Sequence, residues 1–241
     1  MHGLILAGGE GARLAAGGIA VPKPLVEVAG KPQLLRLLET LDALGCDSLT
    51  CAIRADLADV GPLLDARRFR APLKVMPCRT PSSLHTLAET LPGVPPGPVF
   101  CSMVDTVMRW RDWGEVYRQT EARLVEGADA VLAVTSFVDD ESPVYVSRQA
   151  GGFVQKISDE PVAPVCVTGG VYGLGVEARR AVAAAVGRGL ERMRGFLQAF
   201  VAGGARVATV DVARIIDIDR PSDLQVANAW LTAPDASEPE V

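Results

Sequence analysis

The chain reads Leu4-Ile-Leu-Ala-Gly-Gly-Glu-Gly-Ala-Arg13 near its first residue, and Pro22-Lys23-Pro24 follows after a short loop. Leu4 to Ala7 is an apolar run typical of a strand, and the glycines after it let the backbone turn tightly. Because glycine lacks a Cβ atom, successive N–H groups of such a turn can converge on an anion. A helix that begins just afterwards would direct its positive end the same way. With the charges of Arg13 and Lys23, the stretch predicts a polyphosphate-binding turn; a Gly-rich turn with surface cations is the alternative.

Two better-known phosphate-binding turns do not match this stretch. A P-loop has four residues between its first glycine and a Gly-Lys-Ser/Thr run, and no such run follows Gly8. The dinucleotide-binding turn has its third glycine at the position of Arg13, where a helix and a strand pack closely. A guanidinium at that position indicates a charge placed against phosphate and argues against a dehydrogenase.

The stretch resembles a known family signature. Leu6-Ala-Gly-Gly-x-Gly-x-Arg-Leu14 followed by Pro22-Lys-Pro-Leu25 is similar to the signature of the nucleotidyltransferases that make NDP-sugars and related activated phosphates. One departure is that Ala15-Ala-Gly-Gly18 stands where the family often has Pro-x-Thr. The resemblance implies that Arg13 stabilises the leaving pyrophosphate and that Lys23 bridges the reacting phosphates. It implies that the nucleotide-binding residues are Leu6, Ala7, Gly8, Gly9, Gly11, Arg13 and Lys23.

Composition excludes several other classes of protein. The 241 residues, 49% hydrophobic and 22% charged, suffice for one sizeable α/β domain. A net charge of −5 argues against a nucleic-acid partner, and no apolar run approaches the roughly 20 residues that span a bilayer. We therefore expect neither nucleic acid nor membrane as a partner, and no signal peptide. An odd count without zinc-site spacing predicts reduced, buried thiols in a cytoplasmic protein: Cys46, Cys51, Cys78, Cys101 and Cys166.

Strand and helix patterns alternate over the first hundred residues, which predicts βαβ units and a largely parallel sheet. Gln33–Leu44 has helical spacing, 128–137 predicts a buried strand, and 144–157 predicts an antiparallel hairpin. The resemblance implies a three-layer α/β/α sandwich of the nucleotide-diphospho-sugar transferase (Rossmann-like) type, with a mixed, mostly parallel sheet. We expect one domain over residues 1–232 and a disordered acidic tail over 233–241.

A run of small residues, Thr80-Pro-Ser-Ser83, precedes a predicted helix that begins near Leu84. Ser82 or Ser83 can cap that helix. In the resembled family a turn of this kind contacts the base and ribose, which assigns Ser82 and Ser83 to nucleotide binding. A simple N-cap is the alternative.

Three carboxylates are candidates for a magnesium site. Asp105 follows the apolar run Pro98–Val104, at the end of a strand where a parallel sheet opens onto ligand. Asp217 and Asp219 are two residues apart and share a face of an extended chain. Carboxylate oxygens suit Mg²⁺, and the resemblance implies that Asp105 with Asp217 or Asp219 holds that cofactor. Asp105 as a turn residue and one later Asp as a helix-capping residue are the alternatives.

Two later segments are implicated in acceptor binding by the resemblance alone. Val165–Leu174 resembles the family strand Asn-Ala-Gly-Ile-Tyr, which assigns Thr168, Gly169 and Gly170 to the acceptor. The family's Glu-Lys-Pro is Asp159-Glu-Pro161 here, so Lys156 is a substitute for the missing lysine by proximity alone.

The sequence thus predicts an Mg-dependent transferase that moves an NMP group from an NTP to a sugar 1-phosphate and releases pyrophosphate. The partners are an NTP and a small phosphorylated acceptor, and the oligomeric state, with a homodimer among the options, is open. One alternative is a cytidylyltransferase acting on an alcohol phosphate or phosphonate. Another is a non-catalytic homologue that binds a nucleotide or a sugar phosphate.

Overall fold

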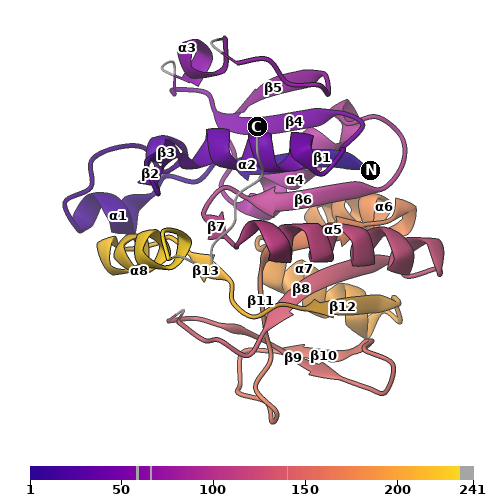
Figure 1. Cartoon of the computed structure of the whole chain (residues 1–241). Coiled ribbons are helices and arrows are strands. Elements are labelled where there is room, and N and C mark those ends of the chain that lie inside the picture. The colour runs from indigo at the N-terminus through magenta and orange to yellow at the C-terminus, as the bar shows by residue number, and fades with distance from the viewer. Residues whose placement is uncertain (58–59, 66, 140, 234–241) are drawn as a thin grey trace.

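The protein forms three layers, with one mixed sheet between two groups of helices (Figure 1). The structure, a computed structural model, describes residues 1–57, 60–65, 67–139 and 141–233. Among these residues no helix is long and apolar enough to cross a membrane. The three-layer sandwich predicted from the sequence is confirmed.

The N-terminal half of the sheet is parallel, because its strands are joined by helical crossovers. The order is β6-β1-β4-β5, and Leu4 of β1 stands beside Thr50 of β4 and Cys101 of β6. Ligand-binding loops of such sheets follow the carboxyl ends of the strands. These strands are β1 (His2–Ala7), β4 (Leu49–Arg54), β5 (Leu73–Cys78) and β6 (Val99–Met103).

The other half of the sheet is built around β11 (Val167–Leu174), which runs antiparallel to β6 on one side and to β8 on the other. β12 continues the sheet parallel to β8, and the hairpin of β9 and β10 pairs with the start of β11. The register of β11 against β8 shifts between Thr168 and Tyr172, where two glycines lie. These strands are β8 (Ala130–Thr135), β9 (Val144–Arg148), β10 (Val154–Ser158) and β12 (Val207–Asp211).

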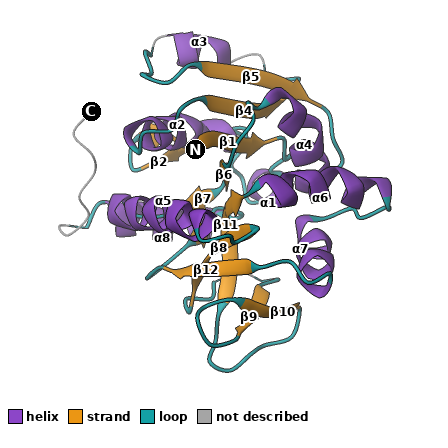
Figure 2. Ribbon diagram, turned by 90° about the vertical axis from the view of Figure 1, so that its right-hand side faces the viewer, coloured by secondary structure: helices purple, strands orange, loops and turns teal. Residues whose placement is uncertain are grey.

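The sheet is covered on both faces, and each face has its own hydrophobic core (Figure 2). On one face Ile5 and Phe100 pack with apolar residues of α2 (Gln33–Ala43), α3 (Val60–Asp65) and α5 (Trp110–Val125). On the other face Leu4 and Cys101 pack with α4 (Ser83–Thr90), α6 (Val176–Gly187) and α7 (Met193–Ala202). Adjacent residues of β1 thus point to opposite cores, as strand geometry requires.

A smaller third core lies beside the carboxyl ends of β1 and β6. Leu14, Val28, Val107, Ile216 and Ala227 are buried in it. It joins the residues after the Gly-rich turn to the last helix of the chain. Its elements are α1 (Ala12–Ala16), the 3-10 turn Lys23–Leu25, β2 (Glu27–Val28), β3 (Lys31–Pro32), β7 (Thr106–Val107), β13 (Ile216–Asp217) and α8 (Pro221–Leu231); a second 3-10 turn, Leu91–Gly93, follows α4.

The predicted elements lie where the patterns place them. The helix expected over Gln33–Leu44 is α2, the buried strand of 128–137 is β8, and the hairpin of 144–157 is β9 and β10. Ser82 is the N-cap of α4, so the predicted cap is confirmed. All five cysteines are free and buried, as predicted. The tail expected to be disordered lies, from residue 234 on, outside the described residues.

Candidate functional site

The candidate site lies at the carboxyl ends of the central strands β1 and β6, where three distant segments of the chain meet. The Gly-rich turn follows β1, Asp105 follows β6, and Asp219 lies between β13 and α8. β13 pairs with β7, and the N–H of Ile218 donates to the carbonyl oxygen of Asp105 at 3.0 Å. This pairing brings the segment of Asp219 beside the end of β6.

The glycines of the turn serve different purposes. Gly11 has a φ of +65°, in the left-handed region that glycine adopts without strain. A Cβ atom on Gly8 would stand 2.9 Å from the Thr86 hydroxyl, so this glycine allows α4 to pack closely. No atom of the described residues comes within 4 Å of a Cβ built on Gly9, which leaves that position open to a ligand.

The helix expected after the turn is short. α1 spans five residues, Ala12–Ala16, and its N-cap Gly11 offers no side-chain hydrogen bond. The dipole of one turn is weak, because it sums over few peptide units. The positive charge at this site therefore comes mainly from Arg13 and Lys23.

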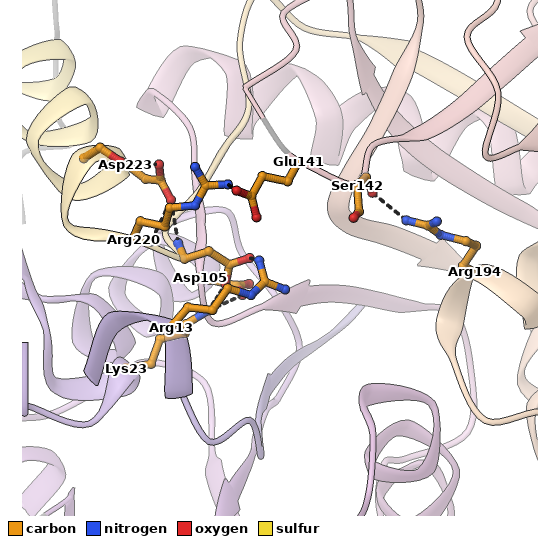
Figure 3. Close-up of polar contacts among 10 residues, drawn as sticks. Arg13, Lys23, Asp105, Glu141, Ser142, Arg194, Arg220 and Asp223 are labelled. Carbon is orange, nitrogen blue, oxygen red and sulfur yellow. Dashed lines mark hydrogen bonds and ion pairs between the residues drawn. The ribbon is translucent and has the colours of Figure 1, made fainter. Parts of the chain in front are cut away.

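Lys23 is the centre of a charged network (Figure 3). Its Nζ donates to Asp105 Oδ2 at 2.8 Å and to Asp219 Oδ1 at 2.6 Å. Arg13 donates to the other oxygen of Asp219 at 2.6 Å. Asp219 thus joins the two cations that the sequence assigns to catalysis, and Asp105 is brought into the same cluster.

The side chain of Lys23 is only 10% exposed, which would favour its neutral form. Burial lowers the pKa of Lys23, but the charges of Asp105 and Asp219 together with their hydrogen bonds outweigh it. The pKa of Lys23 is raised from 10.5 to about 12. The ammonium group is therefore charged at neutral pH, and together with Arg13 it balances the two carboxylates.

Asp223 holds this cluster in place, a role that the sequence analysis did not assign. Its carboxylate is nearly buried and accepts the backbone N–H groups of Asp219 at 3.0 Å and Arg220 at 2.7 Å. The sequence signal was present, since an acidic residue at the third position of a helix is the second half of a capping box. Asp223 sits at that position of α8, two residues after Pro221.

A cleft of about 430 Å³ runs from the Gly-rich turn to the start of α4. Among the residues that line it, Thr80 and Thr86 were not predicted from the sequence. Two of the predicted nucleotide-binding residues do not line the cleft. Ala7 is buried in the core, and Lys23 donates to Asp219, which does line it. The lining includes Leu6, Gly8, Gly9, Gly11, Arg13, Ser82, Ser83, Met103 and Asp219.

The two serines differ in their hydrogen bonding. Ser82 Oγ accepts the N–H of His85 at 3.4 Å, and its hydroxyl approaches the carbonyl oxygen of Glu191 and His85 Nδ1. The hydroxyl of Ser82 is therefore engaged in fixing α4. Ser83 is the first residue of that helix and faces the cleft without the cap role.

A smaller hollow of about 40 Å³ adjoins the cleft, and Arg13 and Asp219 border both. Thr168 and Gly169, which the sequence assigns to the acceptor, line this hollow together with Asp217 and Arg220. Two other acceptor candidates lie elsewhere. The Cα of Gly170 faces Thr106 and Met103, where a Cβ would be 2.4 and 2.6 Å from their side chains. Lys156 is exposed on β10 and is not among the residues that line either space.

The donor chemistry of the site fits a hard divalent cation. Asp105 and Asp219 share one ammonium group, and carboxylate oxygens are the ligands that Mg²⁺ prefers. Asp217 accepts a hydrogen bond from the Thr106 hydroxyl at 3.2 Å. Among the described residues, however, no group of three or more His, Cys, Asp or Glu side chains is close enough together to form a metal site. A hard cation takes six or more oxygen ligands, so the carboxylates alone would not complete its coordination.

Comparison with known proteins gives the family. Residues 3–200 match the model of the MobA-like NTP transferase domain. This chain belongs to that family. The resemblance stated from the sequence is confirmed, and the match covers the Gly-rich turn, Lys23, Asp105 and the strand of Thr168.

One plant protein and two solved structures show what this MobA-like NTP transferase domain is similar to. Mannose-1-phosphate guanylyltransferase 1 of Arabidopsis thaliana is 28% identical over 169 residues, which are 67% of this chain and 45% of that protein. The chain thus spans under half the length of that relative. Two solved structures share the fold. The inositol-1-phosphate CTP transferase from T. maritima has a TM-score of 0.77 at 15% identity, over 96% of both chains. A putative glucose-1-phosphate thymidylyltransferase from Bacillus anthracis has a TM-score of 0.82 at 18% identity, over 100% of this chain and 98% of that one.

Proposed function

We propose that this chain transfers an NMP group from an NTP to a sugar 1-phosphate, releasing pyrophosphate and forming an NDP-sugar. The observation that carries the proposal is the cluster of Lys23, Asp105, Asp219 and Arg13, set beside an open Gly-rich turn at the mouth of a cleft. Family membership and the name of the plant relative support the substrate class.

In the proposed reaction an oxygen of the acceptor phosphate attacks the α-phosphorus of the NTP. A new P–O bond forms there while the bond from the α-phosphorus to the bridging oxygen breaks, and that oxygen leaves with pyrophosphate. Such a transfer depends on positioning and charge neutralisation rather than on a protein nucleophile. The backbone N–H groups of Gly8–Gly11 would bind the triphosphate, which an open Gly9 permits.

The two cations have separate roles in this proposal. Arg13 is exposed at the edge of the cleft and stabilises the charge that develops on pyrophosphate. Lys23 is fixed between two carboxylates and bridges the phosphates at the reacting centre. Asp105 with Asp217 or Asp219 would hold Mg²⁺, which neutralises phosphate charge when it is bound. The five free, buried cysteines support the prediction of a reducing, cytoplasmic location.

Thermal shift with each of the four NTPs, with and without Mg²⁺, tests the nucleotide half of the proposal. At a ligand concentration 100-fold above its dissociation constant, one-site binding stabilises a protein by about 2.7 kcal/mol. We expect a clear shift with one NTP. Absence of a shift with every NTP would contradict the proposal.

Pyrophosphate release tests the chemistry, with the preferred NTP and a panel of sugar 1-phosphates and alcohol phosphates. Asp219→Asn should reduce turnover about 100-fold or more, because it removes the carboxylate charge that positions Lys23 and Arg13. Asp211→Asn is the matched control, since Asp211 pairs with Arg148 at 2.6 Å on the exposed end of β12. Release with CTP and an alcohol phosphate alone would favour the cytidylyltransferase. Binding of an NTP without release would favour the non-catalytic homologue.

A further inference from the structure

Arg220 lies at the rim of the smaller hollow, immediately after Asp219 in the chain. Arg220 lines the space together with Thr168, Gly169 and Arg13. Its backbone N–H is fixed by Asp223 at the start of α8. Figure 3 shows the side chain directed toward Glu141, with which its Nη2 forms an ion pair at 2.5 Å.

The other cations near the hollow are committed to the protein. Arg13 and Lys23 both hold Asp219. Arg194, apart from this group in Figure 3, donates to the carbonyl oxygen of Ser142 at 2.5 Å and pairs with Asp159. Lys156, the substitute expected from the sequence, is exposed on β10.

The partner of Arg220 is an exposed carboxylate, whereas Arg194 also donates to the backbone carbonyl of Ser142 and the Asp219 that holds Arg13 is only 28% exposed. The side chain of Glu141 is 62% exposed and that of Arg220 is 37% exposed. Ion pairs as exposed as this contribute little to stability, because water solvates both charges well. A phosphomonoester carries more charge than a carboxylate, and it accepts two parallel N–H groups of a guanidinium. Phosphate can therefore displace Glu141 from Arg220.

The size of the hollow agrees with such an exchange. About 40 Å³ holds little more than water, whereas sites for small organic ligands are several hundred Å³. An acceptor bound in this hollow requires side chains at the rim to move, and Arg220 and Glu141 form an exposed contact that can open.

The geometry points to Arg220 as the residue that binds the phosphate of the acceptor, with Glu141 as its partner in the free protein. This inference rests on the proposed function, of which it names the acceptor contact. Glu141 competes with the acceptor for Arg220, so the two side chains have opposite effects on acceptor affinity.

Calorimetric titration without nucleotide tests this directly, with mannose 1-phosphate, glucose 1-phosphate and inositol 1-phosphate as the probes. Arg220→Met should weaken binding of the best probe by roughly 10-fold or more, because it removes a bidentate phosphate contact. Glu141→Gln should tighten the same binding by roughly threefold, because the competing charge is gone. Arg220→Lys should restore part of the affinity that Arg220→Met loses.

The exposed pair of Arg180 and Glu177 on α6 provides matched controls, with a distance of 2.6 Å and exposures of 72% and 60%. Arg180→Met and Glu177→Gln should leave probe affinity unchanged. The NTP-induced thermal shift reports whether each variant is folded. If Arg220→Met does not fold, Glu141→Gln still tests the inference, because it alters an exposed side chain.

The inference is overturned if Glu141→Gln weakens binding as Arg220→Met does, since the pair would then act structurally. It is also overturned if neither variant changes the affinity, or if no probe binds even to Glu141→Gln. Failure of the proposed function gives a different result. Acceptor binding would then follow the expected pattern while no NTP yields pyrophosphate.

Discussion

Lys23 places one ammonium group between two carboxylates that come from distant segments of the chain. Asp105 is 82 residues away and Asp219 is 196 residues away. Removing one member of such a partly buried cluster leaves the others with uncompensated charge. The cluster therefore contributes to stability as well as to the proposed chemistry.

The raised pKa of Lys23 predicts a pH dependence of stability. Because the pKa is about 12 in the folded protein and 10.5 in the unfolded one, the stabilisation is complete below pH 10.5 and is lost as the pH rises through about 12. Between pH 9 and pH 12 the free energy of unfolding of the wild type should fall by about 1.5 kcal/mol more than that of Lys23→Met, because half of the folded ammonium groups are still charged at pH 12. Urea unfolding at pH 9, 10.5 and 12 measures both.

Lys74→Met is the control for this experiment, since Lys74 donates to the carbonyl oxygen of Gly93 on an exposed strand edge. Its free energy of unfolding should fall with pH as steeply as that of the wild type. Cysteines and tyrosines titrate in all three proteins and cancel in the comparison. Equal slopes for the wild type and Lys23→Met would show that the carboxylates do not raise the pKa of Lys23.

At the scale of elements, two glycines have opposite surroundings. One lies in a turn that is open to ligand, and the other lies in a strand packed against its neighbours. Gly9 lies in the turn between β1 and α1, with space where a Cβ would stand. Gly170 lies within β11, where a Cβ would overlap Thr106 and Met103. The resemblance assigned Gly169 and Gly170 to the acceptor, but a Cβ on either would meet a side chain of the protein itself, Ile215 for Gly169 and Thr106 for Gly170.

Alanine substitutions should distinguish the two glycines. Gly9→Ala should change the free energy of unfolding by no more than about 0.5 kcal/mol, because the methyl group meets no atom of the described residues. It should nevertheless weaken NTP binding, since the methyl group stands where phosphate approaches. Gly170→Ala should cost about 1–3 kcal/mol through overpacking.

Urea unfolding and NTP titration measure the two effects for both glycine variants. If Gly9→Ala binds NTP as tightly as the wild type, the triphosphate does not approach the turn at Gly9. A Gly170→Ala protein of wild-type stability would contradict the packing of β11 described here.

At the scale of the whole molecule, β11 joins the two halves of the sheet. It pairs with β6 on one side and with β8 on the other, and both hydrophobic cores include residues from both halves. Neither half can bury its apolar faces without the other. This supports the prediction that residues 1–232 form a single domain.

A single domain predicts one cooperative unfolding transition. Backbone circular dichroism and tryptophan fluorescence should give the same midpoint in urea, because Trp113 is buried against the main sheet and Trp230 lies on α8. Trp230→Phe should leave the fluorescence midpoint coincident with that of circular dichroism. Two separated transitions would show that the halves unfold independently.

Much of this architecture could be read from local patterns. Leu4–Ala7, the helical spacing of 33–44 and the hairpin of 144–157 depend on residues a few positions apart, which is the range over which periodicity acts. The N-cap at Ser82 was predictable for the same reason. The end of α1 at Gly17 and Gly18, the second of which has a φ of +93°, also follows a local signal, since glycine commonly ends a helix.

The sequence alone determined the family, the alternation of strands and helices over the first hundred residues, and the Gly-rich turn with its two cations. These depend on residue types at fixed short spacings. Only the tertiary structure decided that Lys23 lies between Asp105 and Asp219. It also decided that Asp223 fixes the backbone of Asp219 at the start of α8. The hollow of Thr168 is bordered by Arg220 rather than by Lys156, which is likewise a result of the tertiary structure. Such contacts follow from which strands become neighbours in the sheet, and that choice is made by burial of the whole chain rather than by any local pattern.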